Sequence, residues 1–328
     1  MARHPIGDEF GLIERHFAPI ARNFPGALAL ADDAALIDLD PGHQLVATTD
    51  ALIADVHFFA DDPPDLIARK LLRVNLSDLA AMGADPRAYL VALALPKDTD
   101  EAWLAAFAEG LAADSEGFGI ALAGGDTVAT GGPLSLALTA LGQVPAGAAL
   151  MRSGAKAGDG VYVSGTIGDG ALGLMALKGD VDIAAPHRDQ VIERYRLPQP
   201  RLSLGQSLVG MAHAAIDVSD GLIADLGHIC RASGIGVTIK AAAVPLSEAA
   251  REAAANDGVL LARLLSGGDD YELAFTAPPE MDGAIAALGE ELELPVCAIG
   301  QVGPGTGVVV GDSDELGLVF DGGGYRHF

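Results

Sequence analysis

The chain has 328 residues and a formal net charge of −25, from 45 acidic and 20 basic side chains. Such a surface repels nucleic acids and anionic membranes, because binding to either depends on basic contacts. The sequence contains no run of 18 apolar residues, no signal-peptide layout and no CxxC pair. These absences argue against a membrane span, a disulfide scaffold and a thiolate metal site, and we expect a cytoplasmic protein.

Helical and strand signals alternate from the beginning of the chain. Residues 13–24 predict a helix that ends at Pro25-Gly26. Residues 34–39 and 44–49 predict two paired strands joined by a Pro41-Gly42 turn. Further elements are a helix over 65–82, closed by Gly83, an amphipathic helix over 98–113 and buried strands over 89–95, 120–123 and 134–141.

A stretch rich in Pro, Gly, Ala and Lys, residues 144–160, separates two halves. We therefore expect domains at 1–147 and 148–328. The second half predicts strands at 161–165, 216–219 and 271–276, with helices near Leu172 and over 222–232. The expected fold class is α/β (α+β): two domains of mixed sheet with layered helices.

Acidic residues recur beside Gly, Ser or Thr within apolar sequence. They are found in Asp32-Asp33, Thr48-Thr49-Asp50, Asn75-Leu-Ser-Asp78, Gly124-Gly-Asp-Thr127, Asp217-Val-Ser-Asp-Gly-Leu222 and Gly267-Gly-Asp-Asp-Tyr271. A carboxylate among Leu, Val and Ala loses hydration, at a cost of roughly several kcal/mol unless a cation or hydrogen bonds compensate. The repetition indicates a site for several metal ions that hold polyphosphate. The total charge by itself is also explained by solubility alone.

Two of these clusters fall on the predicted hairpin. Asp33 and Asp50 would lie near the same end of it, and strand alternation puts Thr48 and Asp50 on one face and Thr49 on the other. Hydroxyl and carboxylate oxygens suit a hard cation such as Mg²⁺. For Asp33, ordinary turn chemistry explains the residue equally well.

Asp78 is the acid that is hardest to explain structurally. It is three residues after Asn75 in the predicted helix, so both project from one face. It lies too deep in that helix to serve as a cap, which favours metal binding.

The remaining clusters follow predicted strands. Glycines in 124–127 would let the backbone approach a phosphate, although a tight loop would use the same residues. At the strand-to-helix junction we expect Ser219 or Asp220 to be the N-cap, with exposed N–H groups that favour an anion. Capping leaves Asp217 for another role.

Motifs of other phosphate enzymes are absent. There is no GxxxxGK[ST] loop, no HRD and DFG pair and no HExxH pair. His57, next to Phe58-Phe59, is interpreted from the residues alone as a half-buried neighbour of the aromatic rings.

The motifs, in this order, resemble those of the thiamine-monophosphate kinase family, in the superfamily of aminoimidazole-ribotide synthetase and selenophosphate synthetase. The resemblance runs from about Phe10 to Phe328. Its most specific parts are the Asn75-Leu-Ser-Asp78 block and Ser266-Gly-Gly-Asp-Asp-Tyr-Glu-Leu273. It implies two PurM-like domains with the active site in the cleft between them, and a homodimer joined through the N-terminal, ATP- and Mg²⁺-binding domains.

The implied activity is ATP-dependent phosphorylation of thiamine monophosphate to thiamine diphosphate, the last step of thiamine diphosphate biosynthesis. The implied Mg²⁺ ligands are Asp33, Thr48, Thr49, Asp50, Asp78, Asp126, Asp217 and Asp220. The implied ATP contacts are Gly125, Asp126, Arg152 and Ser219, and the implied substrate contacts are His57, Asp269 and Tyr325. The implied catalytic residues are Asp78, Asp217 and Arg152. In a direct in-line transfer, Arg152 would help on the ATP side, and Asp78 and Asp217, one from each domain, would act through shared metal.

The chain departs from the family pattern in three places. Residues 29–33 lack both glycines of the family's Gly-x-Gly-Asp-Asp loop, Asp269 replaces Glu, and Val128 replaces an Arg. Two rival functions remain: another ATP-using enzyme of the superfamily with a different acceptor, and a non-catalytic metal-binding protein of the same fold. The near-complete acidic set argues against the second.

Overall fold

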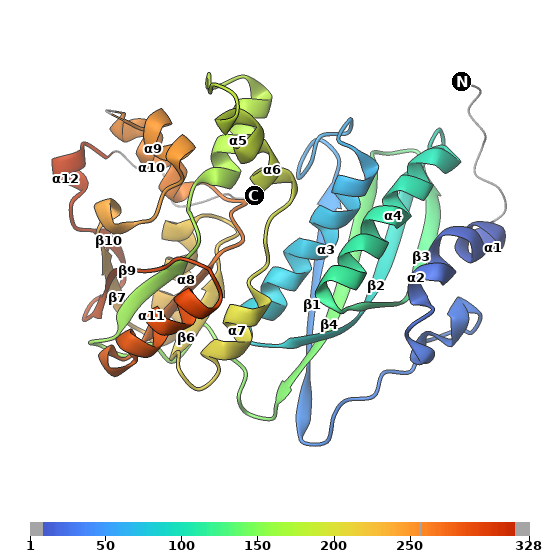
Figure 1. The fold of residues 1–328 in the computed structure, drawn as a ribbon, viewed down its shortest axis with the longest axis horizontal. Helices are drawn as coiled ribbons and strands as arrows, with labels where there is room; N and C mark the ends of the chain where they lie inside the picture. The colour runs from blue at the N-terminus through green and yellow to red at the C-terminus, as the bar shows by residue number, and fades with distance from the viewer. Residues whose placement is uncertain (1–8, 256, 319–328) are drawn as a thin grey trace. The chain divides into compact units, whose positions relative to one another are not determined.

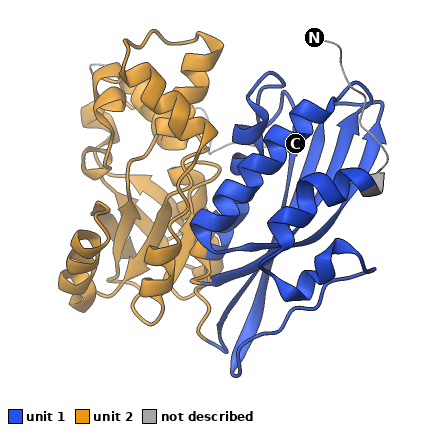
Figure 2. Cartoon of the chain, turned by 45° about the vertical axis from the view of Figure 1, so that its right-hand side comes forward, with its two compact units in different colours: residues 1–79, 84–147 blue, residues 80–83, 148–328 orange. Residues whose placement is uncertain are grey.

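The structure is a computed structural model that describes residues 9–255 and 257–318. The chain divides into two compact units (Figure 2). Unit 1 comprises the described residues up to Leu79 together with Ala84–Gly147, and unit 2 comprises Ala80–Gly83 and the described residues from Ala148 onward.

Unit 1 is built on a four-stranded sheet of order β1-β4-β2-β3, in which β2 and β3 are parallel and the other neighbours antiparallel. The strands are β1 (His43–Ile53), β2 (Asp85–Pro96), β3 (Ala121–Thr130) and β4 (Ser135–Pro145). The helical segments are α1 (Glu9–Leu12), η1 (Ile13–Phe17), α2 (Ala18–Ala21), η2 (Pro25–Leu30), α3 (Pro64–Ala81) and α4 (Glu101–Phe118).

The helices α3 and α4 cover one face of this sheet (Figure 1). The start of α4 is capped by the Asp100 carboxylate, which accepts the Trp103 amide at 2.9 Å. Its end is Gly119 in the left-handed region, with φ of 68°. Leu72 of α3 and Phe107 of α4 have no exposed surface, so the apolar faces of both helices form the core of this unit.

The opposite face of the sheet is mostly open. Alternate residues of the strands point to it, and Leu45, Leu90 and Val128 there are 49%, 38% and 51% exposed. The short segments α2 and η2 lie against β3 at one edge. Among the described residues, helices therefore cover one side of the sheet, and the other side is covered only near β3.

The expected hairpin of residues 34–39 with 44–49 is wrong. β1 pairs with β4 along its whole length. Residues 34–39 form no strand, and the Leu36 amide donates instead to the Gly26 carbonyl at 2.8 Å. Alternate residues of this segment, such as Ile37, are half-buried, which explains why its sequence alternates like that of a strand.

Two other elements differ from expectation. The helix expected over residues 13–24 is present but has other bounds: α1, η1 and α2 form one continuous helical run from Glu9 to Ala21, with a π-helical turn in its middle. The Gly124–Thr127 stretch lies inside β3, which runs on to Thr130, rather than in a loop after residues 120–123. The glycine is still required at 125, since a Cβ there would lie 2.0 Å from the Val91 carbonyl oxygen.

Unit 2 is built on a six-stranded sheet of order β10-β7-β9-β5-β8-β6, in which β10 and β7 are parallel and the other neighbours antiparallel. The strands are β5 (Gly160–Ser164), β6 (Ala214–Asp217), β7 (Gly236–Ile239), β8 (Leu273–Ala277), β9 (Val296–Gly303) and β10 (Gly307–Val310). The helices are α5 (Asp169–Lys178), α6 (His187–Arg196), α7 (Leu202–Leu208), α8 (Leu222–Ser233), α9 (Glu248–Ala253), α10 (Gly258–Ser266), α11 (Asp282–Glu291) and α12 (Ser313–Leu316), with 3₁₀ turns η3 (Ala241–Ala243) and η4 (Pro279–Met281).

Both faces of this second sheet are covered. Val161 and Ala274 belong to a core that includes residues of α8, whereas Tyr162 and Phe275 belong to a core that includes residues of α7 and α11. The rings of Tyr162 and Phe275 stack with centroids 5.2 Å apart. The strands alternate between two cores because each is sandwiched between helices.

The expected fold class is confirmed by these two mixed sheets with their layered helices. Among the helices of the described residues, none combines the length and apolar character that crossing a bilayer requires.

Candidate active site

One acidic group lies where β1 faces α3. The Thr48 hydroxyl donates to an Asp78 carboxylate oxygen, and the Asp50 amide donates to the Asn75 side-chain oxygen at 3.1 Å. Asn75 is fully buried, and its amide nitrogen donates to the Leu71 carbonyl at 2.9 Å, which fixes its orientation. Burial, and secondarily the charge of Asp78, raise the pKa of Asp50 to about 6. A hydroxyl and two carboxylates thus share a poorly hydrated location, which a hard cation would relieve.

A second group lies on the open face of the same sheet. The Thr49 hydroxyl donates to the Leu138 carbonyl at 3.0 Å and accepts from the Thr139 hydroxyl at 3.1 Å. Thr48 and Thr49 therefore point to opposite faces, as alternation predicts. Strand register puts Asp126 on the face of Thr49.

Asp33 belongs with this open-face group. Asp33, Gly125 and Asp126 line a pocket of about 550 Å³ on the face that also exposes Leu90. The expectation that Asp33 and Asp50 lie at one end of a hairpin is wrong, because Asp50 faces α3 on the other side of the sheet. Asp32 accepts the Asp33 amide at 2.9 Å, a local contact of the kind found in turns.

His57 is held by the turn that follows β1. Its Nδ1 accepts the Ile53 amide at 3.0 Å, so the neutral ring carries its proton on Nε2. The backbone is held as well, because Lys70 Nζ donates to the His57 carbonyl at 3.2 Å. The ring therefore offers a donor of fixed tautomer.

In unit 2, β6 ends at Asp217 and leads into a loop with an unexpected anchor. The amides of Ser219, Asp220 and Gly221 donate to one oxygen of Asp225, at 3.0, 3.0 and 3.1 Å. The N-cap of α8 is Gly221, with φ of 119° and no side-chain cap bond. The expected capping by Ser219 or Asp220 is wrong, and the amides expected to favour an anion already bind a carboxylate of the chain.

Asp225 was not singled out from the sequence. It lies between Ala224 and Leu226 in α8, so the same signal, an acid with apolar neighbours, was present. It is 2% exposed, and burial followed by the charge of Asp220 raises its pKa to about 7.

The loop that contains Asp269 runs beside the 217–221 loop. The amide of Asp269 donates to the Ser219 carbonyl at 3.0 Å, and that of Tyr271 to the Val218 carbonyl at 2.8 Å. Asp269 has φ of 71°, a conformation that Asp adopts more readily than most side chains. Two candidate loops of unit 2 thus form one hydrogen-bonded pair.

The next two acids of that motif are structural. Asp270 is 1% exposed and accepts the amides of Gly168 and Gly170 at 2.7 and 3.0 Å, while burial raises its pKa to about 8. Glu272 has no exposed surface and binds Arg194 at 2.8 Å and Arg201 Nε at 2.6 Å. Arg194 and Arg201 were not predicted from the sequence, because nothing in their local sequence indicates a buried carboxylate partner.

Arg152 lies near the 217–221 loop. Its side chain is exposed, and its carbonyl accepts the Ser233 hydroxyl at 3.2 Å. The pKa of His228 is lowered by burial first, then by the charges of Arg231 and Arg152. A ring nitrogen of His228 lies within 4.8 Å of the carboxylates of Asp220 and Asp225, which brings the arginine and the loop acids into one region. Tyr325 lies outside the described residues.

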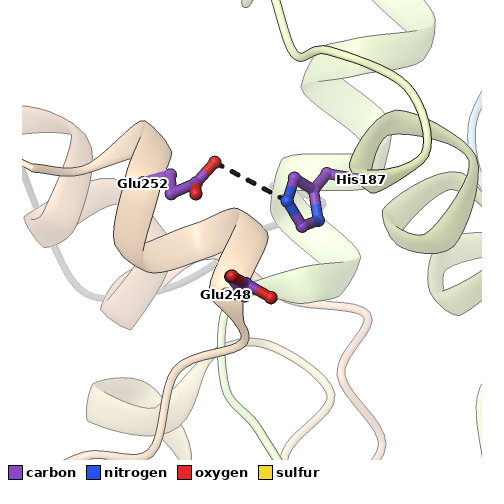
Figure 3. Close-up of side chains that lie close together, drawn as sticks. All are labelled: His187, Glu248 and Glu252. Atoms are coloured by element: carbon purple, nitrogen blue, oxygen red, sulfur yellow. Dashed lines mark ion pairs between the residues drawn. The ribbon is translucent and has the colours of Figure 1, made fainter.

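A further cluster with metal-binding side chains lies away from these loops, on α6 and α9 (Figure 3). His187 Nε2 is 3.6 Å from Glu252 Oε2, and Glu248 completes a group whose ligand atoms lie within 4.8 Å of one another. Glu252 has 65% of its side chain exposed. No sequence motif had indicated this group.

Comparison with known proteins gives a consistent result. Residues 31–144 match the family model "AIR synthase related protein, N-terminal domain", and residues 156–313 match the corresponding C-terminal domain. The chain is 44% identical to the thiamine-monophosphate kinase of Salmonella typhimurium over 98% of both chains.

Solved structures agree. The thiamine-monophosphate kinase of Stenotrophomonas maltophilia has a TM-score of 0.84 and 42% identity, over 94% of this chain and 99% of that one. AaThiL complexed with AMPPCP and TMP has a TM-score of 0.78 and 30% identity, over 98% and 97%. The PurM-like arrangement of two mixed sheets, the acidic loops and these similarities together show that the chain belongs to the thiamine-monophosphate kinase family.

Proposed function

We propose that the protein phosphorylates thiamine monophosphate with ATP to give thiamine diphosphate. The observation that carries this proposal is the half-buried group of Thr48, Asp50 and Asp78 beside the buried Asn75, in a chain 44% identical over 98% of its length to a thiamine-monophosphate kinase. The relative solved with AMPPCP and TMP supports both substrates.

The residues present fit Mg²⁺. Carboxylate and hydroxyl oxygens are the ligands that this ion prefers, and burial together with the charge of Asp78 raises the pKa of Asp50, a cost that a bound cation would offset. Thr48, Asp50 and Asp78 would hold ions on the α3 side of the unit 1 sheet, Asp33, Thr49 and Asp126 on its open face, and Asp217 and Asp220 in unit 2. When bound, Mg²⁺ neutralises and aligns the phosphates of the two anionic substrates.

The chain's own part is binding and alignment. The attacking group is an ionised phosphate oxygen, so the protein needs to supply no strong general base. Gly125, Asp126, Arg152 and Ser219 bind ATP in this proposal, and the exposed Arg152 adds positive charge beside the 217–221 loop.

The acceptor is bound by His57, Asp269 and Tyr325. His57 donates from Nε2 to a phosphate oxygen, because its Nδ1 is occupied by the Ile53 amide. Asp269 is fixed through its backbone to the Ser219 carbonyl, so the acceptor loop and the metal-binding loop keep a constant spacing.

We also propose that unit 1 forms a homodimer through the part of its open sheet face that lies outside the pocket of Asp33, Gly125 and Asp126. Leu45 and Val128, which do not line that pocket, are exposed there and would be buried by a partner. Val128→Glu should shift sedimentation from dimer to monomer. Val309→Glu on β10, where the side chain is 56% exposed, is the matched control and should leave the mass unchanged. A wild-type monomer at micromolar concentration would contradict the dimer.

The deciding experiment mixes protein, ATP, Mg²⁺ and thiamine monophosphate and measures thiamine diphosphate by oxidation to fluorescent thiochrome. Product that requires all three components supports the kinase. ATP binding without product would move the assignment to a related enzyme with another acceptor. Mg²⁺ binding without ATP binding would favour a non-catalytic metal-binding protein.

A further inference from the structure

We propose that Asp225 is a positioning residue that holds the 217–221 loop in the shape that presents Asp217 and Asp220. Its role rests on the proposed function, since those two acids are there assigned to Mg²⁺. Asp225 itself belongs to none of the expected ligand or substrate contacts.

The backbone amides of this loop form an anion-binding site, and the carboxylate of Asp225 from the same chain occupies it. Three consecutive amides, of Ser219, Asp220 and Gly221, converge on one oxygen of Asp225 within 3.0 to 3.1 Å. Successive N–H groups arranged in this way form a concave site that ordinarily takes a phosphate or another anion. Because the carboxylate is only 2% exposed and sits on α8, it ties the loop to a helix whose apolar face is in the core.

The other side of the loop is held independently. The carbonyls of Val218 and Ser219 accept the amides of Tyr271 and Asp269 at 2.8 and 3.0 Å. Gly221 has φ of 119°, and a Cβ there would lie 2.4 Å from the Ser266 carbonyl oxygen. These contacts fix the carbonyls of the loop, whereas Asp225 fixes its amides, so the direction of the Asp220 side chain depends on both.

Two substitutions separate hydrogen bonding from charge. Asp225→Asn keeps an acceptor oxygen at the same position and removes the charge, whereas Asp225→Ala removes the acceptor. Asp312→Ala is the matched control, because Asp312 also accepts two consecutive amides in unit 2, those of Ala241 and Ala242, at 2.8 and 3.0 Å.

The first readout is metal dependence. We expect D225A to raise the Mg²⁺ concentration for half-maximal turnover, and the dissociation constant for Mn²⁺ measured by electron paramagnetic resonance, by about 10-fold or more, the usual effect of removing a group that orients metal ligands. D225N and D312A should stay near wild type. Thermal unfolding establishes that each variant is folded, and Asp225→Ser, whose hydroxyl is too short to reach three amides, replaces D225A if that variant does not fold.

The second readout does not involve activity. Hydrogen exchange of the amides of residues 219–221 should accelerate in D225A and stay slow in D225N. Unchanged exchange and unchanged Mn²⁺ affinity in D225A would overturn the proposal, as would equal losses in D225A and D225N, which would assign the effect to charge. If the wild type makes no thiamine diphosphate, the proposed function fails, while exchange and Mn²⁺ binding still decide the role of Asp225.

Discussion

Glu272→Gln should strongly destabilise unit 2, although Glu272 is part of the most specific motif and not a proposed ligand. The side chain has no exposed surface and binds Arg194 at 2.8 Å, Arg201 Nε at 2.6 Å and the Ser164 hydroxyl at 2.6 Å. The arginine side chains are only 16% and 20% exposed. The neutral side-chain amide of the glutamine would leave the two mostly buried guanidinium groups without the negative charge of Glu272.

The expected loss follows from that burial. Removing one partner of a buried ion pair costs about 3–5 kcal/mol, because the charge left behind keeps its desolvation penalty. For a domain of this size, that loss corresponds to a fall of roughly 10 °C in the unfolding midpoint. Urea unfolding followed by circular dichroism and a thermal scan measure the two quantities.

Glu101→Gln is the control. Glu101 accepts from Arg15 at 3.0 Å, but the arginine and glutamate side chains are 50% and 36% exposed, and water screens the pair. The control should leave both midpoints unchanged within error. A loss below about 1 kcal/mol in Glu272→Gln, the range of an exposed pair, would show that water reaches the arginines and would refute the reasoning.

Five further substitutions, of which Gly131→Ala is a control, test the site and its supports. Asp217→Asn should keep the fold and lower turnover by orders of magnitude in the thiochrome assay; near-normal kinetics at saturating Mg²⁺ would contradict its role. Asp269→Glu should retain activity, with a stability loss of roughly 1–2 kcal/mol because its φ of 71° disfavours a longer side chain; complete inactivity would mean a differently built acceptor pocket. Gly125→Ala should cost about 1–3 kcal/mol in urea unfolding, since its Cβ would lie 2.0 Å from a β2 carbonyl oxygen. Gly131→Ala, which meets nothing within 4 Å, should be neutral. The pKa of Asp270 is about 8 in the folded protein against an ordinary 3.8, so the folded state binds this proton more tightly than the unfolded state does. Protonated Asp270 therefore adds to the free energy of unfolding at low pH, and this contribution is lost as the pH rises from about 4 to 8. Asp270→Asn removes this pH dependence. The difference in the free energy of unfolding between wild type and this variant should therefore shrink by a few kcal/mol from about pH 4 to pH 8, at roughly 1.4 kcal/mol per pKa unit. A difference that stays constant over this range would contradict the raised pKa of Asp270.

The sequence alone was enough to predict that acids lie in an apolar setting. Asp50, Asp78 and Asp217 have Leu, Val and Ala as neighbours in the sequence. An acid on a solvated surface does not need apolar neighbours, so this pattern indicates an apolar setting. The helix over α3 was predictable as well, since Pro64 and Gly83 bound an apolar periodic run. These properties depend on the local sequence alone, so they do not change with the position of the segment in the fold.

The tertiary structure decided which strand pairs with β1 and therefore which acids meet. The local pattern of 34–39 fits a strand, but β4, about 90 residues away in the chain, supplies the longer antiparallel partner. That choice puts Asp50 against α3 and leaves Asp33 with Asp126 on the open face. Strand pairing depends on hydrogen bonds between distant segments, which no local pattern encodes.

The same division holds in unit 2. The sequence indicated a cap and an anion site at Ser219 and Asp220, but the fold brings Asp225 back over the loop to take the three amides. Glu272 likewise acquires Arg194 and Arg201 from segments more than 70 residues away. Residue type and neighbours determine that a buried carboxylate needs a partner, and only the folded chain determines whether that partner is an amide, an arginine or a metal ion, because the partner must come within about 3 Å.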